Sequence, residues 1–278
     1  MITRFAPSPT GPLHLGHAYA AILAHDMARA AGGRFLLRIE DIDRQRSKPE
    51  WEAQLIEDLR WLGLAWDGPV MRQSDRLNIY RQTLEKLWQS GLLYRCDCTR
   101  RDIEQAAAAP QEGAPLGPDG IVYPGTCRVR GAPRPGEALP DAALRLRMDR
   151  AATHCHFTEI CDPHRGKHAI TPQEMTERVG DIVLARREMG TSYHLAVVLD
   201  DAAQGVTHVT RGADLFEATA IHVTLQHLLE LPTPSYCHHR LIRDETGKRL
   251  AKRDDARALA KYRSEGATPA DIRRMVGL

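Results

Sequence analysis

Two histidines three residues apart, His14 and His17, stand close to the start of the chain. They follow the turn-forming segment PSPTGP and precede an alanine-rich stretch that predicts a helix over 15–31. A helix N-terminus presents unpaired N–H groups and partial positive charge, which suit a phosphate. Imidazole N–H groups could stabilise charge that develops on a triphosphate, and Gly16 leaves room for a base or ribose beside the backbone. Two surface histidines at a helix start would give the same four letters, HLGH.

Three cysteines have the spacing of a metal site. Cys96 and Cys98 are separated by one residue, and Cys127 follows in a loop-rich stretch. Three thiolates and one further ligand suit tetrahedral zinc. A rival set contains Cys155, Cys161, His164 and His168, helped by His154 and His156. Reduced cysteines without a metal would also account for both patterns.

The composition is that of an ordinary globular protein. Of 278 residues, 42% are hydrophobic and 27% are charged, and the formal net charge is +2, so a nucleic-acid partner would need a local basic patch. No run of about 18 apolar residues indicates a membrane span, and the N-terminus lacks a basic-then-apolar leader. Six cysteines in a chain of this length indicate a reducing compartment, where cysteines bind metal or fill the core. We therefore expect a cytoplasmic protein.

The order of the predicted elements indicates a parallel α/β sheet. In the first part, strands are expected at 2–6 and 34–41, and helices at 15–31, 47–63 and 75–90. The segment 96–140 is rich in glycine and proline and is expected to be a loop-rich insertion. Further strands are expected at 143–148, 181–187 and 194–202, followed by a strand and a helix over 206–229, a basic segment at 243–253 and a short helical tail.

The opening RFAPSPTGPLHLGH resembles the first signature of class I aminoacyl-tRNA synthetases of the glutamyl branch. There the HIGH motif binds ATP, so the resemblance implies that His14, Gly16 and His17 bind the nucleotide and that both histidines act in catalysis. The second family signature is a lysine loop near KMSKS, and GKRLAKRDD offers Lys252 as the catalytic, ATP-binding cation that steadies the leaving pyrophosphate. Ala251 replaces the usual serine and removes a hydroxyl. By itself, such a basic stretch would also suit a solvated surface.

The resemblance also implies a set of glutamate-binding residues: Arg4, Ala6, Ser8, Glu40, Tyr193 and Arg211. Glu40 matches the acid expected near the α-amino group, and Arg211 matches the arginine that pairs with a substrate carboxylate. A guanidinium fork suits a carboxylate geometrically. Open α/β sheets bind ligands at the carboxyl ends of their strands, where we expect these residues to gather. Taken singly, each charged residue could be an ordinary surface ion pair.

The pattern C-x-C…Y-x-x-x-C resembles that of a truncated group of synthetases in this branch. The resemblance implies that Tyr123 completes a zinc site with Cys96, Cys98 and Cys127. Only 25 residues follow Arg253, whereas discriminating glutamyl-tRNA synthetases continue into anticodon-binding domains. The truncated enzymes activate glutamate without tRNA and attach it to queuosine in the anticodon of tRNA(Asp), and we expect this reaction. Two alternatives remain: a minimal glutamyl-tRNA synthetase that charges a tRNA 3′ end, and a non-catalytic RNA-binding or regulatory module that kept the fold.

The resemblance implies an α/β fold, a class I synthetase Rossmann-type parallel sheet with a zinc-binding insertion and a short helical C-terminal tail. The expected parts are the first half of the catalytic domain at 1–95, the insertion at 96–175, the second half at 176–240, and the lysine loop and tail at 241–278. The expected cofactors are one structural Zn²⁺ and Mg²⁺ bound with ATP. The expected partners are ATP, L-glutamate and tRNA(Asp) bearing queuosine, with no membrane.

Overall fold

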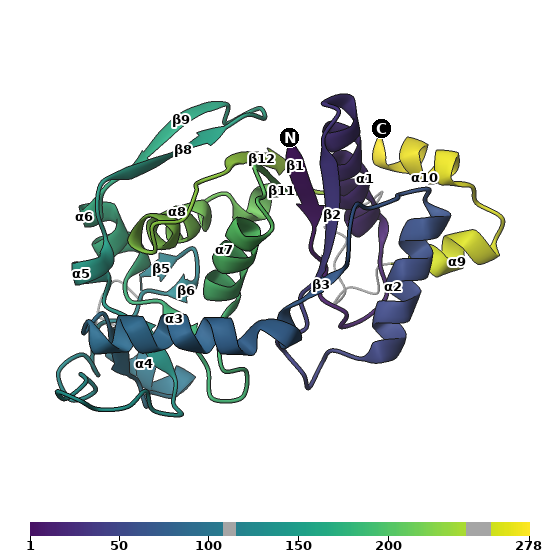
Figure 1. Ribbon diagram of the computed structural model, residues 1–278. Helices are drawn as coiled ribbons and strands as arrows, with labels where there is room; N and C mark the ends of the chain where they lie inside the picture. The colour runs from purple at the N-terminus through teal and green to yellow at the C-terminus, as the bar shows by residue number, and fades with distance from the viewer. Residues whose placement is uncertain (108–114, 243–256) are drawn as a thin grey trace.

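Strands and helices alternate in the N-terminal part of the computed structural model, which describes residues 1–107, 115–242 and 257–278 (Figure 1). The elements are β1 (Ile2–Phe5), α1 (Leu15–Ala30), β2 (Arg34–Ile39), α2 (Pro49–Trp61) and β3 (Met71–Arg72). α2 begins at a proline, whose missing N–H is tolerated in the first turn of a helix. β2 lies between β1 and β3 and pairs with both in parallel. These strands form the first half of the predicted parallel sheet.

A second set of strands lies beside the first. β11 (His208–Gly212) and β12 (Ser235–His239) are parallel, β8 (Cys155–Glu159) is parallel to β12, and β9 (Gly166–Ile170) folds back antiparallel to β8. β1 and β11 are neighbours (Figure 1), and the Thr207 N–H donates to the Ile2 carbonyl at 3.0 Å. Residues at the carboxyl ends of β1, β2 and β11 line one cavity, at the edge where open α/β sheets bind ligands.

A separate three-stranded sheet is antiparallel. It contains β4 (Leu93–Arg95), β7 (Leu144–Leu146) and β10 (Val183–Ala185), with β7 in the centre. The loop-rich segment after β4 carries α4 (Arg100–Ala107) and a short hairpin of β5 (Leu116–Gly117) and β6 (Gly120–Ile121). The strands expected at 143–148 and 181–187 are therefore present in shorter form, and they pair with each other.

One predicted strand is wrong. The segment HLAVVLDDA at 194–202 lies in α7 (Tyr193–Ala203), whose N-terminus is capped by the Ser192 hydroxyl, which accepts a backbone N–H at 3.3 Å. Because consecutive residues of this helix are buried, its sequence shows little helical periodicity, and a short apolar run fits a buried strand equally well. Asp200 and Asp201 consequently lie on the last turn of a helix and not at the end of a strand.

The structure describes further short and long helices. They are η1 (Gln73–Arg76), α3 (Leu77–Gln89), α5 (Met148–Ala151), α6 (Pro172–Glu174), η2 (Met175–Val179), η3 (Ala213–Leu215), α8 (Thr219–Leu228), α9 (Leu259–Ser264) and α10 (Pro269–Val276). One apolar cluster surrounds α1, and another surrounds α7 and α8. The expected helical tail, α9 and α10, joins the first cluster through Leu259, Ile272 and Val276. None of the helices in the described ranges is long and apolar enough to cross a membrane.

Two cysteines form a disulfide, contrary to the expectation that all six bind metal or fill the core. Cys161, just after β8, is bonded to Cys237 of β12, and their Cα atoms are 4.9 Å apart. β8 and β12 are paired neighbours, so the fold brings together two residues that are 76 positions apart in the sequence. Sequence spacing alone carries no signal of such a long-range pair.

Candidate functional site

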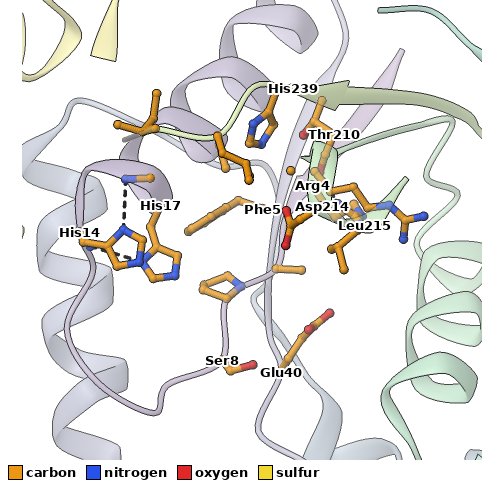
Figure 2. Close-up of a pocket in the computed structure, with 18 of the residues that line it drawn as sticks. Arg4, Phe5, Ser8, His14, His17, Glu40, Thr210, Asp214, Leu215 and His239 are labelled. Atoms are coloured by element: carbon orange, nitrogen blue, oxygen red, sulfur yellow. Dashed lines mark hydrogen bonds between the residues drawn. The ribbon is translucent and has the colours of Figure 1, made fainter. Parts of the chain in front are cut away.

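One cavity of about 500 Å³ brings together every described residue that the sequence predicts for glutamate or ATP. They are Arg4, Ala6, Ser8, His14, Gly16, His17, Glu40, Tyr193 and Arg211. Figure 2 shows His14 and His17 on one side, Arg4 on the other, and Ser8 and Glu40 at the lower edge. The cavity is also lined by residues that the sequence did not single out, among them Thr10, Thr210, Asp214, His239 and Arg240.

His14 and His17 cap the start of α1 by reciprocal hydrogen bonds. His14 Nδ1 accepts the Gly16 N–H at 3.1 Å, and His17 Nδ1 accepts the His14 N–H at 3.2 Å. This is the pattern of a capping box, made here by two imidazoles whose ring centroids are 3.8 Å apart. Both rings are thus fixed at the positive end of a 16-residue helix, where an anion is favoured.

Gly16 is needed for this arrangement of rings. A Cβ atom at this position would approach Cε1 of the His14 ring to 3.0 Å, closer than an ordinary van der Waals contact. Glycine therefore lets the His14 ring fold over the first turn of α1. The sequence predicts space for a ligand at Gly16, and the structure adds this second reason for the residue.

Lys252 and Ala251 lie outside the described residues. Described residues on both sides of 243–256 lie at the cavity or next to the residues that line it. Ile242 lines the cavity, and the Leu259 N–H donates to the Leu13 carbonyl at 2.8 Å, directly before His14. Ile242 thus lines the predicted ATP site, and Leu259 is hydrogen-bonded to the residue before His14.

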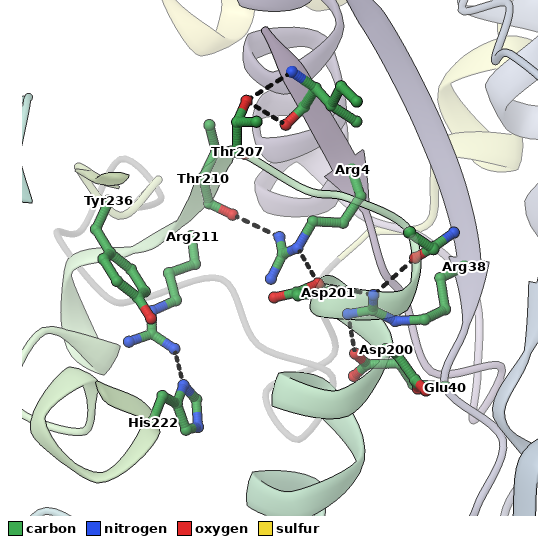
Figure 3. A network of polar contacts seen from close by, with 12 residues as sticks. Arg4, Arg38, Glu40, Asp200, Asp201, Thr207, Thr210, Arg211, His222 and Tyr236 are labelled. Atoms are coloured by element: carbon green, nitrogen blue, oxygen red, sulfur yellow. Dashed lines mark hydrogen bonds and ion pairs between the residues drawn. The ribbon is translucent and has the colours of Figure 1, made fainter. Parts of the chain in front are cut away.

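Asp201 joins two arginines on the opposite side of the cavity (Figure 3). Its Oδ1 accepts the Arg4 Nε–H at 3.0 Å and the Arg38 Nη1–H at 2.7 Å. Burial raises the pKa of Asp201, but the two guanidiniums outweigh it and hold this pKa below its ordinary value. Sequence reasoning missed Asp201 and Arg38 as site residues, because it placed the aspartate at the end of a strand and had no way to pair it with Arg4.

Glu40 follows β2 and lines the cavity beside this cluster. Burial raises its pKa, although the charges of Arg38 and Arg4 oppose the shift. A substrate ammonium group would give the buried carboxylate a cationic partner and favour its ionised form. Burial also raises the pKa of Tyr193, so its phenol stays neutral at physiological pH and offers a hydroxyl to the cavity.

Arg211 is held by neutral side chains. Its Nε–H donates to His238 Nε2 at 3.0 Å, and its Nη1–H donates to His222 Nδ1 at 2.7 Å. Its Nη2–H donates to the Thr219 hydroxyl at 2.7 Å. The residue is only 6% exposed, yet it lines the cavity. Neither histidine was singled out from the sequence, because both lie in apolar segments without a motif.

The predicted metal residues lie close together at the end of β4. The sulfurs of Cys96, Cys98 and Cys127 are all within 4.8 Å of one another. Tyr123 Oη is 3.5 Å from Cys96 Sγ and 3.3 Å from Cys98 Sγ, and it accepts the Cys127 N–H at 3.0 Å. These four side chains are arranged so that they could hold a metal ion.

Two arginines offset negative charge at this cysteine cluster. Arg130 Nη2 donates to Cys127 Sγ at 3.2 Å, and Arg145 Nε donates to Cys96 Sγ at 3.3 Å. The Arg145 guanidinium also lies over the Tyr123 ring, 3.9 Å from its centroid. Burial opposes ionisation of Cys127, but hydrogen bonds from Tyr123 and Arg130 lower the pKa of its thiol to about 6. The cluster is therefore suited to thiolate ligands.

The rival metal set is not assembled. Cys161 is bonded to Cys237, so it offers no thiolate. His168 Nε2 is hydrogen-bonded to the His164 carbonyl at 2.7 Å, and the His164 ring stacks on Phe216. Among the residues with described positions, this set does not form a cluster of metal-ligating atoms.

The geometry agrees with comparisons with known proteins. Residues 1–278 match the family model of the class I (E and Q) tRNA synthetase catalytic domain. A glutamyl-Q tRNA(Asp) synthetase of Rhodobacter capsulatus is 78% identical over 100% of both chains. Another, from Nocardia farcinica, is 45% identical over 97% of this chain and 81% of its own. The chain belongs to the glutamyl-Q tRNA(Asp) synthetase family of class I tRNA synthetases.

Solved structures show the same fold. The glutamate tRNA ligase of Elizabethkingia meningosepticum superposes with a TM-score of 0.77 at 29% identity, and the match covers 100% of this chain and 60% of the ligase. Methionyl-tRNA synthetase of Mycobacterium tuberculosis, at 10% identity and a TM-score of 0.60, shares the fold alone. The predicted fold class and family are thereby confirmed, and the chain is an enzyme of the ligase type.

Proposed function

We propose that this enzyme activates L-glutamate with ATP in the absence of tRNA and transfers it to the queuosine base in the anticodon of tRNA(Asp). The observation that carries the activation step is the single cavity, which combines two helix-capping histidines with Arg4, Glu40 and Arg211. The acceptor is proposed from the name of the relatives, one of which matches over the full length. A tRNA substrate also supports the expected cytoplasmic location.

In the first step, an oxygen of the glutamate α-carboxylate attacks the α-phosphorus of ATP, and pyrophosphate leaves with the electrons of the broken P–O bond. The N-terminus of α1, with His14 and His17, would hold the phosphates and stabilise the charge that develops on them. Glu40 would bind the substrate ammonium, and Arg211 would bind the side-chain carboxylate. The α-carboxylate would then face the histidines. Mg²⁺ bound with ATP would neutralise phosphate charge.

In the second step, a hydroxyl of the queuosine cyclopentene ring attacks the acyl carbon, and AMP leaves. The new bond is an ester, and the hydroxyl proton is lost. No covalent intermediate with the enzyme is needed, because positioning and charge stabilisation suffice.

We also propose that Cys96, Cys98, Cys127 and Tyr123 bind one structural Zn²⁺. Tetrahedral zinc with bonds of about 2.3 Å to sulfur and about 2.0 Å to oxygen requires ligand separations of about 3.5 to 3.8 Å. Cys98 Sγ lies 3.5 Å from Cys127 Sγ and 3.3 Å from Tyr123 Oη, close to that range. Burial raises the pKa of the Tyr123 phenol, so the metal would have to deprotonate it. The ion would fasten the loop-rich segment to the end of β4.

Replacing Cys98 with serine should remove most of the bound metal. The purified enzyme should contain about one zinc per chain, because three thiolates and a phenol complete a tetrahedral site. Inductively coupled plasma mass spectrometry measures this content. Cys155→Ser, which changes a free cysteine outside the cluster, is the matched control and should keep its zinc. A folded, metal-free wild-type enzyme would refute the assignment.

Replacing Lys252 with alanine should slow glutamyl-adenylate formation by about 10²- to 10³-fold, because a cation on the leaving pyrophosphate is lost. ATP–pyrophosphate exchange gives the rate, and calorimetry should show little change in glutamate binding. Lys261→Ala, in the exposed part of α9, is the control. An unchanged exchange rate in Lys252→Ala would exclude this role.

Transfer of labelled glutamate tests the proposed acceptor. The enzyme is incubated with ATP and tRNA from cells that contain queuosine or lack it. Label on the first pool alone supports glutamylation of the anticodon base. Equal label on both pools would point to charging of a tRNA 3′ end. Absence of label from both, together with no pyrophosphate exchange, would point to a non-catalytic RNA-binding or regulatory module.

A further inference from the structure

Arg211 and Arg4 both line the cavity but differ in how their charge is balanced. Arg4 donates directly to the carboxylate of Asp201. Arg211 contacts no carboxylate within ion-pair distance among the residues whose positions are described, and its three protein hydrogen bonds go to two imidazoles and a hydroxyl. Figure 3 shows its guanidinium turned toward His222 and away from the Asp201 cluster. Arg211 is therefore a buried cation that is well held but not neutralised.

The hydrogen bonds fix the tautomer of His222. A guanidinium can only donate, so His222 Nδ1 must be an unprotonated acceptor. In the neutral ring the proton is then on Nε2, which lies 3.0 Å from His194 Nδ1. His194 Nε2 in turn lies 3.2 Å from a carboxylate oxygen of Asp119. In this series each group donates a hydrogen bond to the next, from Arg211 through both imidazoles. The series ends at the carboxylate of Asp119, two imidazoles away from Arg211.

A second series of hydrogen bonds fixes the tautomer of His238 in the same way. His238 Nε2 accepts the Arg211 Nε–H, so the ring proton is on Nδ1, which lies 2.5 Å from Glu159 Oε2. Here one neutral imidazole separates the guanidinium from the Glu159 carboxylate. Burial lowers the pKa of His222 well below its ordinary value and that of His238 to about 4, so both rings remain neutral at physiological pH.

The donors of Arg211 match what a carboxylate requires. A guanidinium has five N–H groups, and the three bonds to protein leave one N–H on each terminal nitrogen. Two N–H groups can bind a carboxylate in bidentate fashion. The anionic side chain of a substrate would be attracted by the uncompensated charge of Arg211, whereas a neutral carboxamide would gain only a hydrogen bond.

We propose that His222 and His238 are positioning residues that set the choice of acid over amide: by holding Arg211 with neutral acceptors, they keep its charge for the side-chain carboxylate of glutamate and disfavour glutamine. This selectivity rests on the proposed function, because glutamate must be the amino acid activated. A carboxylate at either position would hold the guanidinium equally well but would neutralise it. The neutrality of these hydrogen-bond acceptors is thus what preserves the charge of Arg211. Its effect can be tested separately from that of side-chain packing.

Asparagine and aspartate at position 222 form a nearly isosteric test pair. His222→Asn places an amide oxygen near the site of Nδ1, whereas His222→Asp places a carboxylate there. Glutamate-dependent pyrophosphate exchange gives the KM and kcat for glutamate, and competition gives the inhibition constant of glutamine. His222→Asp should raise the glutamate KM about 30-fold or more, with kcat and the glutamine constant within about threefold of the wild type. His222→Asn should keep a glutamate KM within about threefold.

Equal losses in the two variants would mean that His222 only fills space, and would overturn the inference while the proposed function stands. A wild-type enzyme without glutamate-dependent exchange would overturn the proposed function and the inference with it. If His222→Asp does not fold, ¹⁵N NMR of histidine-labelled wild-type enzyme decides, with the His222 signal assigned by its loss in His222→Asn. A neutral ring protonated on Nε2 supports the inference, and a cationic ring or one protonated on Nδ1 overturns it.

Discussion

Replacing Arg211 with methionine should raise the KM for glutamate by about two to three orders of magnitude and change kcat much less. The methionine side chain keeps part of the apolar stem but removes both the charge and the hydrogen bonds that we propose Arg211 makes to the substrate carboxylate. Loss of one partner from a buried, hydrogen-bonded charge pair costs about 2–5 kcal/mol, or about 30- to 4,000-fold in affinity, and the expected rise lies within this interval. Because the side-chain carboxylate stays unchanged during the reaction, the loss affects binding. Steady-state pyrophosphate exchange measures both constants.

Arg211→Lys is the informative control for this prediction. It keeps a positive charge but loses the planar fork and the bonds to both histidines, so we expect an intermediate rise in KM of about tenfold. Thermal unfolding of both variants separates a loss of binding from a loss of structure. A glutamate KM that stays near the wild-type value in Arg211→Met would remove this residue from the glutamate site.

The fold was largely predictable wherever the sequence has strong hydrophobic periodicity or clear turn and helix-start residues. β1, α1 and β2 follow clear strand, turn and helix signals, and the proline start of α2 is explicit in the sequence. α7 was not predictable from periodicity, because tertiary structure buries most of its surface and removes the polar face that marks a helix. The strand prediction rested on the apolar run alone, whereas the structure shows Ser192 capping the helix.

The candidate site was predictable in its motif residues but not in their partners. Family resemblance identified nine described residues that the fold brings to one cavity, and the cysteine spacing identified a cluster that the fold assembles. The acid that joins Arg4 to Arg38 and the histidines that hold Arg211 come from other elements of the chain. Which acid meets which cation depends on the packing of α7 and α8 against the sheet, and a single sequence does not contain that pairing. The disulfide between Cys161, just after β8, and Cys237 of β12 could not be predicted from the sequence for the same reason.

Replacing Asp201 with alanine should lower the free energy of unfolding by about 3–5 kcal/mol, because two buried guanidiniums lose the carboxylate that they share. Arg38 is 0% exposed and Arg4 is 5% exposed, so water cannot replace the lost partner easily. Arg38 keeps Gln204 at 2.8 Å and Glu40 at 3.4 Å, but among the described residues Arg4 keeps only the Thr210 carbonyl at 3.2 Å. Urea unfolding followed by circular dichroism measures the change. Asp271→Ala, a change in the capping box of α10, is the control and should cost only about 1 kcal/mol.

Asp201→Asn separates the charge of this carboxylate from its shape, and pH supplies the test. The pKa of Asp201 is lowered in the folded enzyme, so its charge stabilises the fold fully above the unfolded pKa of about 3.9. This contribution is lost as the pH falls through the lower, folded pKa. The wild type should therefore be more stable than Asp201→Asn by a constant amount between about pH 5 and 8, and the difference should shrink below about pH 4. A difference that persists unchanged at pH 3 would mean that Asp201 stabilises the enzyme through hydrogen-bond geometry alone, and that the charges of Arg4 and Arg38 are balanced elsewhere.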